Sequence, residues 1–295
     1  MKAEFSEFTY GFSLVNELTK TLPCTAVPIF PSLLEEGKEG GGYDVELLLS
    51  KKGKALYLQF KLSDWMKART AREYRISGHS LSLPYYRFEI TSERISEQHS
   101  LLLSLEDKQP LTFYAAPAFY LKEEINAYWS SDSVTRNSVF VKPSSIGILP
   151  DHNPHRVCFD AASIEKKQGY FFSEPQEIEL FPFQSFSDFL ISEVAKETDT
   201  LENSISRVRE QYASAIENAY RRELDRSLEA ERFEGFLPDR TGISDIWQLR
   251  DRLDRDLLRL RKILSEPVDG RDLLRQVAQV SSGIFGAQAI AVVKE

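Results

Sequence analysis

The stretch from Tyr43 to Leu62 decides the expected fold, and it reads Tyr-Asp-Val-Glu-Leu-Leu-Leu-Ser-Lys-Lys-Gly-Lys-Ala-Leu-Tyr-Leu-Gln-Phe-Lys-Leu. Two apolar runs, at Tyr43–Ser50 and Ala55–Leu62, flank four polar or glycine residues. Runs of this length on either side of a Lys/Gly turn are typical of two strands joined as a hairpin. The stretch therefore predicts a hairpin with its turn at Lys51–Lys54.

Three polar side chains on these two strands are candidate site residues: Asp44, Gln59 and Lys61. Side chains alternate across a strand, so Gln59 and Lys61 point to the same face. If the two strands pair, Asp44 near the open end of the hairpin comes close to both. A glycine run at residues 40–42 precedes Asp44 and would let the backbone approach a ligand closely.

The segments around the hairpin predict a mixed α+β domain. A helix is expected at Glu7–Thr21, where the residues at helical spacing are Phe8, Phe12, Val15 and Leu18, and this helix carries Glu17. A second helix is expected at Ser96–Glu106, in which His99 fits the surface or the edge of the core better than the site. Further strands are expected at Arg87–Thr91, Leu111–Tyr120, Val139–Val141 and Arg156–Asp160.

Near residue 190 the composition becomes strongly charged, which predicts two parts: an α/β domain at 1–190 and a helical region at 191–295. The helical region has apolar residues at alternating three- and four-residue steps, namely Ile246, Leu249, Leu253, Leu257, Leu260 and Leu264. This spacing is typical of an antiparallel helix hairpin or a coiled-coil dimer, so we expect the region to bind a second copy of the chain or a protein partner. Residues Ala289–Val293 could add an edge strand.

Composition excludes several classes of protein. The chain has 295 residues, of which 42% are hydrophobic, and this fraction is ordinary for a globular protein. The net charge of −8 argues against a surface coated in bases for nonspecific binding of nucleic acid. No run of about 18 apolar residues occurs, so no membrane span is expected. The acidic start of the chain does not resemble a secretory signal, and two cysteines in apolar surroundings favour a reducing, cytoplasmic setting. No phosphate-binding loop or dinucleotide fingerprint is present.

Residues 51–75 are locally basic within this acidic chain, with eight bases against two acids. The bases are Lys51, Lys52, Lys54, Lys61, Lys67, Arg69, Arg72 and Arg75. Such a run is often a solvated face, but bases that bracket a site can also hold the backbone of a nucleic acid. We therefore expect these residues other than Lys61 to bind nucleic acid.

The pattern resembles the PD-(D/E)xK nuclease superfamily, in which a helix Glu, a strand Asp and an acid-x-Lys on the next strand form the site. The matching residues are Glu17 in the helix, Asp44 on the first strand, and Gln59-Phe60-Lys61 on the second. The resemblance covers roughly residues 5–120. It implies a restriction-endonuclease-like core, Mg²⁺ or Mn²⁺ held by Asp44, Gln59 and Glu17, and hydrolysis of DNA in preference to RNA, with a setting in prokaryotic defence.

One position departs from the commonest pattern, because Gln59 stands where most members have Glu or Asp. This variant is similar to the Mrr-like branch, in which Gln-x-Lys occurs. An amide oxygen can ligate a hard cation but brings no charge, so the metal would depend more on Asp44, with Glu46 on the same strand face as a stand-in. The alternative is a non-catalytic interaction protein, in which a degenerate nuclease fold binds a partner and the helical region assembles the complex.

Overall fold

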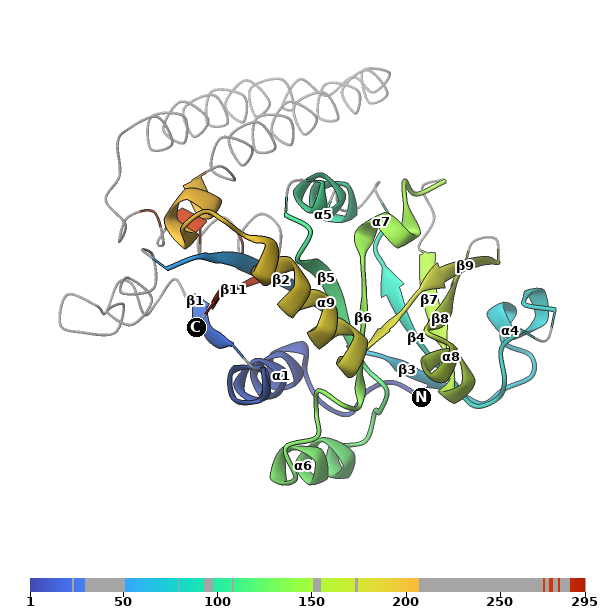
Figure 1. Cartoon of the computed structure of the whole chain (residues 1–295). Helices are drawn as coiled ribbons and strands as arrows, with labels where there is room; N and C mark the ends of the chain where they lie inside the picture. The colour runs from blue at the N-terminus through green and yellow to red at the C-terminus, as the bar shows by residue number, and fades with distance from the viewer. Residues whose placement is uncertain are drawn as a thin grey trace, which may run out of the picture.

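A computed structural model describes residues 1–22, 24–29, 51–78, 80–92, 98–107, 109–150, 155–172, 175–206, 273, 276–277, 281 and 287–294. These residues form a mixed α+β protein with two sheets (Figure 1). The first sheet consists, in spatial order, of β1 (Thr25–Ile29), β11 (Gln288–Val293), β2 (Gly53–Phe60), β5 (Thr112–Pro117), β6 (Ser138–Val141) and β10 (Phe181–Pro182). The second consists of β3 (Asp64–Met66), β4 (Tyr85–Ile90), β7 (His155–Phe159), β8 (Gln168–Phe172) and β9 (Gln176–Glu179).

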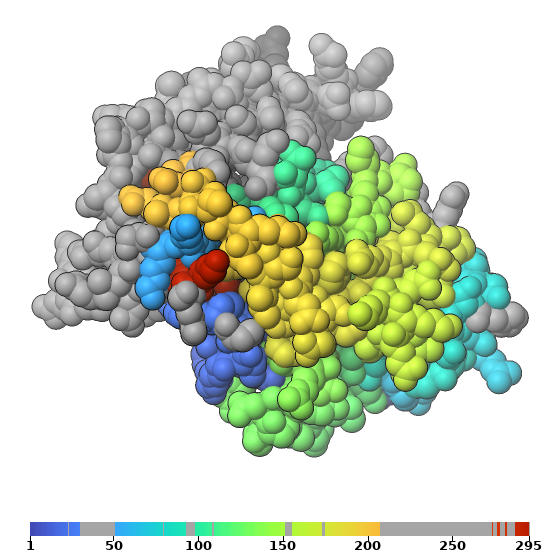
Figure 2. Space-filling view, viewed as in Figure 1, coloured from blue at the N-terminus to red at the C-terminus, as the bar shows by residue number. Residues whose placement is uncertain are grey.

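The first sheet is covered on both faces. One face packs on α1 (Glu7–Thr21), α6 (Lys122–Ser130) and α9 (Phe183–Lys196), which lie in front of the sheet in Figures 1 and 2. The other face packs on α5 (Gln98–Glu106), α7 (Pro143–Ile146) and the inner face of the second sheet. Two short helices, α4 (Arg72–Ile76) and α8 (Ala161–Lys166), accompany the second sheet.

Strand β2 lies at the centre of this arrangement. Its side chains alternate between two cores: Ala55 and Tyr57 join the core beneath the second sheet, whereas Leu56 and Leu58 join the core beneath α1 and α9. Its edges pair with β11 in antiparallel fashion and with β5 in parallel fashion. A strand that is buried on both faces must be apolar almost throughout, which explains the run Ala55–Leu58.

Helix α1 begins and ends where the sequence predicts and buries Val15 and Leu18 as expected, but the first half of its buried face differs from the prediction. Ser6 caps its start by accepting a hydrogen bond from the amide of Thr9 at 3.0 Å. Phe8 and Phe12, which we expected to face the core, are 81% and 56% exposed. Instead, the buried face contains Tyr10, Gly11, Ser13, Leu14, Val15, Glu17 and Leu18. Gly11 explains the choice of face, because a Cβ at this position would lie 2.5 Å from Cδ2 of Phe60 on β2.

Strand β11 shows that the sheet extends into the last residues of the chain. The sequence predicted an edge strand there, but β11 is internal, since it pairs with β1 on one side and β2 on the other. The boundary expected at residue 190 lies inside α9, and Leu201, Ile205, Leu273 and Val277 belong to the same core as Tyr57. Residues 287–294 are therefore part of the α/β domain and not of a separate helical region.

The other helices and strands that the sequence predicts lie close to their expected positions. The bounds of β4, β6, β7 and α5 differ from the prediction by one or two residues. Strand β5 begins one residue later than predicted and ends at Pro117 instead of Tyr120. The predicted hairpin with its turn at Lys51–Lys54 is corrected, because β2 already begins at Gly53 and its two edges pair with β11 and β5. The expectation that Asp44 comes close to Gln59 rested on that hairpin. The predicted strand at 43–50 and the leucine pattern at 246–264 lie outside the described residues. Within the described part of the chain, no helix is both long and apolar enough to cross a membrane.

The internal position of β11 predicts a large effect of mutation near the end of the chain. Ile290 is fully buried in the core beneath α1, so Ile290→Ala should lower the free energy of unfolding by about 2–5 kcal/mol. Lys294→Ala, four residues later and exposed, should change it by no more than about 0.5 kcal/mol. Urea unfolding followed by circular dichroism measures both, and equal midpoints for the two variants would contradict the pairing of β11.

Candidate functional site

Gln59 lies near the end of β2 and is 6% exposed. Its side chain shares a face with Tyr57, because alternate residues of a strand point the same way. Its Nε2 donates a hydrogen bond to the carbonyl oxygen of Phe60 at 3.2 Å, which fixes the amide so that the nitrogen faces this acceptor. The Oε1 atom is buried and has no hydrogen-bond partner among the described residues.

The unpartnered Oε1 of Gln59 is the most informative polar atom of this region. A buried acceptor that lacks a donor costs about 1–3 kcal/mol relative to one that is satisfied. Rotating the amide by 180° would not help, since it would place the oxygen against the carbonyl of Phe60. The site therefore has an unused acceptor that suits a donor or a hard cation.

Lys61 follows β2 and continues its pairing, because its amide donates to the carbonyl of Ala115 at 2.9 Å. Its Nζ lies 3.5 Å from Oε1 of Gln98 on α5 and 5.8 Å from the centre of the Tyr114 ring. Burial lowers the pKa of this ammonium group, whereas the carboxylates of Glu7 and Glu89 partly offset that effect by favouring the charged form. Gln59 and Lys61 thus lie on one face of the sheet, as the sequence predicts.

Tyr114 and His99 form a buried pair behind Lys61. His99 Nε2 lies 2.8 Å from the carbonyl of Gly147, which can only accept, so this nitrogen carries the proton. His99 Nδ1 then accepts from the hydroxyl of Tyr114 at 2.9 Å. His99 is 1% exposed, so it is a core residue. The pair attaches the first turn of α5, and with it Gln98, to the strand next to Lys61.

Sequence reasoning missed the roles of Tyr114 and Gln98. Tyr114 stands in an unbroken apolar run, and only the parallel register between β2 and β5 shows that it is opposite Gln59. Gln98 precedes His99 in the predicted helix, but the contact with Lys61 depends on how α5 packs. No local pattern in the sequence carries either piece of information.

Glu17 does not join these residues, and the structure corrects that expectation. Its carboxylate is 2% exposed and accepts hydrogen bonds from the amide of Val134 at 2.7 Å and the amide of Thr135 at 3.2 Å. It also accepts from the hydroxyl of Thr135. Val134 and the buried face of α1 belong to the core beneath α1 and α9, on the face of the sheet opposite to Tyr57 and Gln59. Glu17 therefore anchors the loop before β6.

Asp44 and Glu46, the strand carboxylates of the predicted site, lie outside the described residues. Within the described part of the chain, no group of three or more His, Cys, Asp or Glu side chains could hold a metal ion. A cation beside Gln59 would thus need at least one carboxylate from elsewhere in the chain, and Asp44 remains the sequence-based candidate.

The predicted nucleic-acid-binding residues divide into two groups at opposite ends of the molecule. Lys51 and Lys52 lie at the start of β2, whereas Lys67, Arg69, Arg72 and Arg75 lie around α4, at the far side of the second sheet in Figures 1 and 2. Lys54 is corrected, because its Nζ lies 3.4 Å from Glu193 and 3.8 Å from Glu197 and its side chain is only 14% exposed. It joins β2 to the end of α9 and does not face a ligand.

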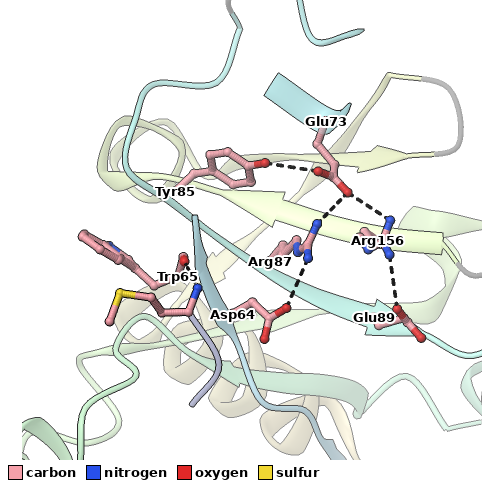
Figure 3. A network of polar contacts seen from close by, with 8 residues as sticks. Asp64, Trp65, Glu73, Tyr85, Arg87, Glu89 and Arg156 are labelled. Atoms are coloured by element: carbon pink, nitrogen blue, oxygen red, sulfur yellow. Dashed lines mark hydrogen bonds and ion pairs between the residues drawn. The ribbon is translucent and has the colours of Figure 1, made fainter. Parts of the chain in front are cut away.

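Glu73 is the one acid of α4, and it points inward (Figure 3). One carboxylate oxygen lies 3.0 Å from Arg87 Nη1 and 3.1 Å from Arg156 Nη1, and the other accepts from the Tyr85 hydroxyl at 3.2 Å. The two arginines in turn pair with Asp64 and Glu89. Burial alone would raise the pKa of Glu73, but a backbone hydrogen bond and the two guanidinium groups outweigh it and hold the pKa below its usual value.

Comparison with known proteins gives no match: no protein-family model matches the chain, and neither do curated proteins or solved structures. Any functional conclusion must therefore come from the residues themselves.

The position of Glu17 predicts a structural phenotype. Glu17→Ala leaves two buried amides of the 134–135 loop without acceptors, so the free energy of unfolding should fall by an amount on the order of 3 kcal/mol. Glu165→Ala, which removes an exposed carboxylate on α8, should change it by no more than about 0.5 kcal/mol. Chemical denaturation in the absence of divalent metal makes the comparison. A Glu17→Ala variant as stable as wild type would contradict the anchoring role.

The lowered pKa of Glu73 predicts a pH-dependent contribution to stability. A carboxylate whose pKa is lower in the folded than in the unfolded chain stabilises the fold above its usual pKa of 4.5 and loses this contribution as the pH falls through the folded value. Wild type should exceed Glu73→Gln in stability by a constant amount at neutral pH and by less as the medium becomes more acidic than pH 4.5. Denaturation series at several pH values test this, and a difference that does not depend on pH would contradict it.

Proposed function

We propose that this chain is a metal-dependent nuclease that hydrolyses phosphodiester bonds, with Gln59 and Lys61 in its site. The observation that carries the proposal is the buried, unpartnered Oε1 of Gln59 two residues before a half-buried ammonium group. An orphan acceptor and a cation side by side fit the needs of a site that holds a divalent metal and a phosphate. The resemblance of the sequence to the PD-(D/E)xK superfamily points to the same two residues.

The topology supports a restriction-endonuclease-like core. In that reading, β2 carries the Gln-x-Lys pair, α5 lies in the connection that follows, and β5 returns parallel to β2. Both strands are buried, and the ends of the parallel pair bring Gln59, Lys61 and Tyr114 together. Parallel strands need a crossover connection of this kind, so the arrangement is also open to other α/β proteins.

The residues fit Mg²⁺ or Mn²⁺ in part. Gln59 Oε1 supplies one neutral oxygen ligand, and Asp44 is the proposed source of negative charge, with Glu46 as a second carboxylate. A bound divalent ion would stabilise charge on the phosphoryl group and lower the pKa of a water molecule. Glu17 takes no part, because its oxygens are already bound to the 134–135 loop.

The side chains of the chain itself have distinct tasks in this proposal. Lys61 holds its ammonium group where negative charge develops on the phosphoryl oxygens. Gln98 accepts from that ammonium group, and the ring of Tyr114 faces it, so both restrict its position. His99 and Gly147 hold Tyr114 in turn. Fixed donors of this kind act without reorganising during the reaction.

A second candidate function is a non-catalytic interaction protein that keeps a nuclease-like fold. The neutral side chain of Gln59 and the structural use of Glu17 favour it, since both lower the number of carboxylates near the site. In this case the charged segment of the chain between α9 and β11 would bind a partner or a second copy. The two functions differ in whether the chain cleaves nucleic acid and binds metal at Gln59.

The first test is cleavage. With Mg²⁺ or Mn²⁺ present, the chain should cut DNA, and DNA in preference to RNA. Lys61→Ala should reduce the rate by about 10²–10³-fold, the usual effect of losing one group that stabilises the transition state. Asp44→Ala should remove activity, Gln59→Glu should lower the Mg²⁺ concentration required, and Lys122→Ala, which removes an exposed cation of α6, should behave as wild type. Wild type that never cleaves, at any metal concentration and with either nucleic acid, would favour the interaction protein.

The second test separates metal binding from activity. Gln59→Leu removes the unpartnered oxygen while nearly keeping the side-chain shape, so the metal-free variant should be as stable as wild type or more stable, by up to about 1 kcal/mol. The same variant should bind Mn²⁺ at least about tenfold more weakly, because the cation loses one ligand. Calorimetric titration with Mn²⁺ and denaturation with a chelator make the two measurements. A metal affinity unchanged in Gln59→Leu would exclude Gln59 as a ligand.

A further inference from the structure

The surface around α4 carries four exposed cations that form no ion pair with an acid in the described part of the chain. Lys67, Arg69, Arg72 and Arg75 are all exposed, and none makes an ion pair with a described residue. We call these four residues the α4 basic surface. Lys67 lies 5.6 Å above the ring of Trp65, whose other neighbour is the ring of Tyr120 at 5.1 Å, so Trp65 is already covered by other side chains.

The inward position of Glu73 produces this surface. Glu73 is the only acid between Lys67 and Arg75, and Arg87 and Arg156 neutralise it from the strands below (Figure 3). A helix of five residues has little stability of its own, so these bonds hold α4 on the sheet. All charged side chains that this segment exposes to solvent are therefore positive, in a chain whose net charge is −8.

We propose that the α4 basic surface binds the sugar-phosphate backbone of a nucleic acid and that Glu73 is the residue that positions it. Three of its four cations are arginines, whose guanidinium forks match the oxygens of phosphate. Because the chain is acidic elsewhere, a localised positive surface fixes which side of the protein a polyanion approaches. The choice of nucleic acid over other polyanions rests on the proposed function.

The surface is also connected to the Gln59–Lys61 site. Lys67 follows Lys61 after β3. Strand β4 carries both Arg87, which binds Glu73, and Glu89, whose carboxylate favours the charged form of Lys61. A nucleic-acid strand bound at α4 would therefore be held by the sheet that also carries Glu89, one of the charged neighbours of Lys61. In this reading the opposite group, Lys51 and Lys52, takes no part in binding.

The experiment measures binding without cleavage. Fluorescence anisotropy with labelled DNA, in a chelator and in the Lys61→Ala background, is recorded over a range of salt concentrations for two matched variants. The test variant replaces Lys67, Arg69, Arg72 and Arg75 by Gln. The control replaces Lys51, Lys52, Lys122 and Arg136, which are exposed cations elsewhere, by Gln. Both change the net charge from −8 to −12, since each loses four positive charges.

The dependence of affinity on salt reports the number of phosphates that the protein contacts. The test variant should reduce the slope of log K against log salt by about 3.6 on duplex DNA and about 2.8 on a single strand, whereas the control should change it by less than about 1. Arg72→Gln with Arg75→Gln should give about half of the effect, which guards against misfolding of the larger variant. Equal slopes for test and control variants would overturn the proposal.

The positioning role of Glu73 predicts a change in DNA affinity opposite to the change that net charge predicts. Glu73→Ala removes a negative charge, so binding governed by net charge alone would become tighter. Positioning by Glu73 predicts weaker binding, by about tenfold, with the circular dichroism of the core unchanged. Tighter binding would overturn the positioning role.

Two further comparisons distinguish nucleic acid from an acidic protein as the partner, and the α4 basic surface from the proposed nuclease activity. Competition by polyglutamate at equal charge concentration should displace DNA poorly, and equally good displacement would overturn the assignment to nucleic acid in favour of an acidic protein. Because cleavage plays no part in the assay, loss of salt-dependent binding in the test variant supports the α4 basic surface even if wild type never cleaves. Conversely, if wild type cleaves DNA but the test variant binds DNA as the control does, this inference is overturned and the proposed nuclease function is not.

Discussion

The structure depends on the burial of β2 on all sides. Its two faces enter two different cores, and its two edges pair with β11 and β5. These neighbours come from residues 112–117 and 288–293, so segments from the middle and from the end of the described chain converge on one strand. The same burial explains the candidate site, because Gln59 and Lys61 continue a strand whose interior admits few polar atoms. A polar side chain in such a place needs a partner, and the Oε1 of Gln59 has none among the described residues.

The faces of the sheet decide which polar residues can act together. Gln59, Lys61 and Tyr114 share one face, whereas Glu17 serves a loop on the other. The outer face of the second sheet carries a separate polar network around Glu73. The proposed metal site near the end of β2 and the basic surface at α4 thus lie on different faces, which is why binding and cleavage are best measured separately.

Local pattern predicted the elements well and their assembly less well. The apolar runs and helical spacings located α1, β2, α5 and most later strands, because these signals depend on neighbouring residues. The strand predicted at Ala289–Val293 is present as β11, but local pattern could not show that it is internal, because its pairing with β2 bridges more than two hundred residues of sequence. Helical spacing alone predicted that Phe8 and Phe12 face the core, whereas the close approach of Gly11 to Phe60 turns the side of α1 that contains Gly11 towards the sheet. For the site, alternation correctly placed Gln59 with Lys61, but it could not place Glu17, since a helix can cover either face of a sheet.

The central claim is that the unpartnered oxygen of Gln59 is a metal ligand. Crystals soaked in Mn²⁺ and measured at the manganese absorption edge test it most directly, because anomalous scattering locates the ion without reference to activity. The account predicts a peak about 2.0–2.6 Å from Gln59 Oε1, the range of oxygen ligands to hard divalent cations, with a carboxylate of the 43–46 segment as a second ligand. A map without a peak at this position, in which Gln59 Oε1 accepts a hydrogen bond from another part of the chain, would contradict it.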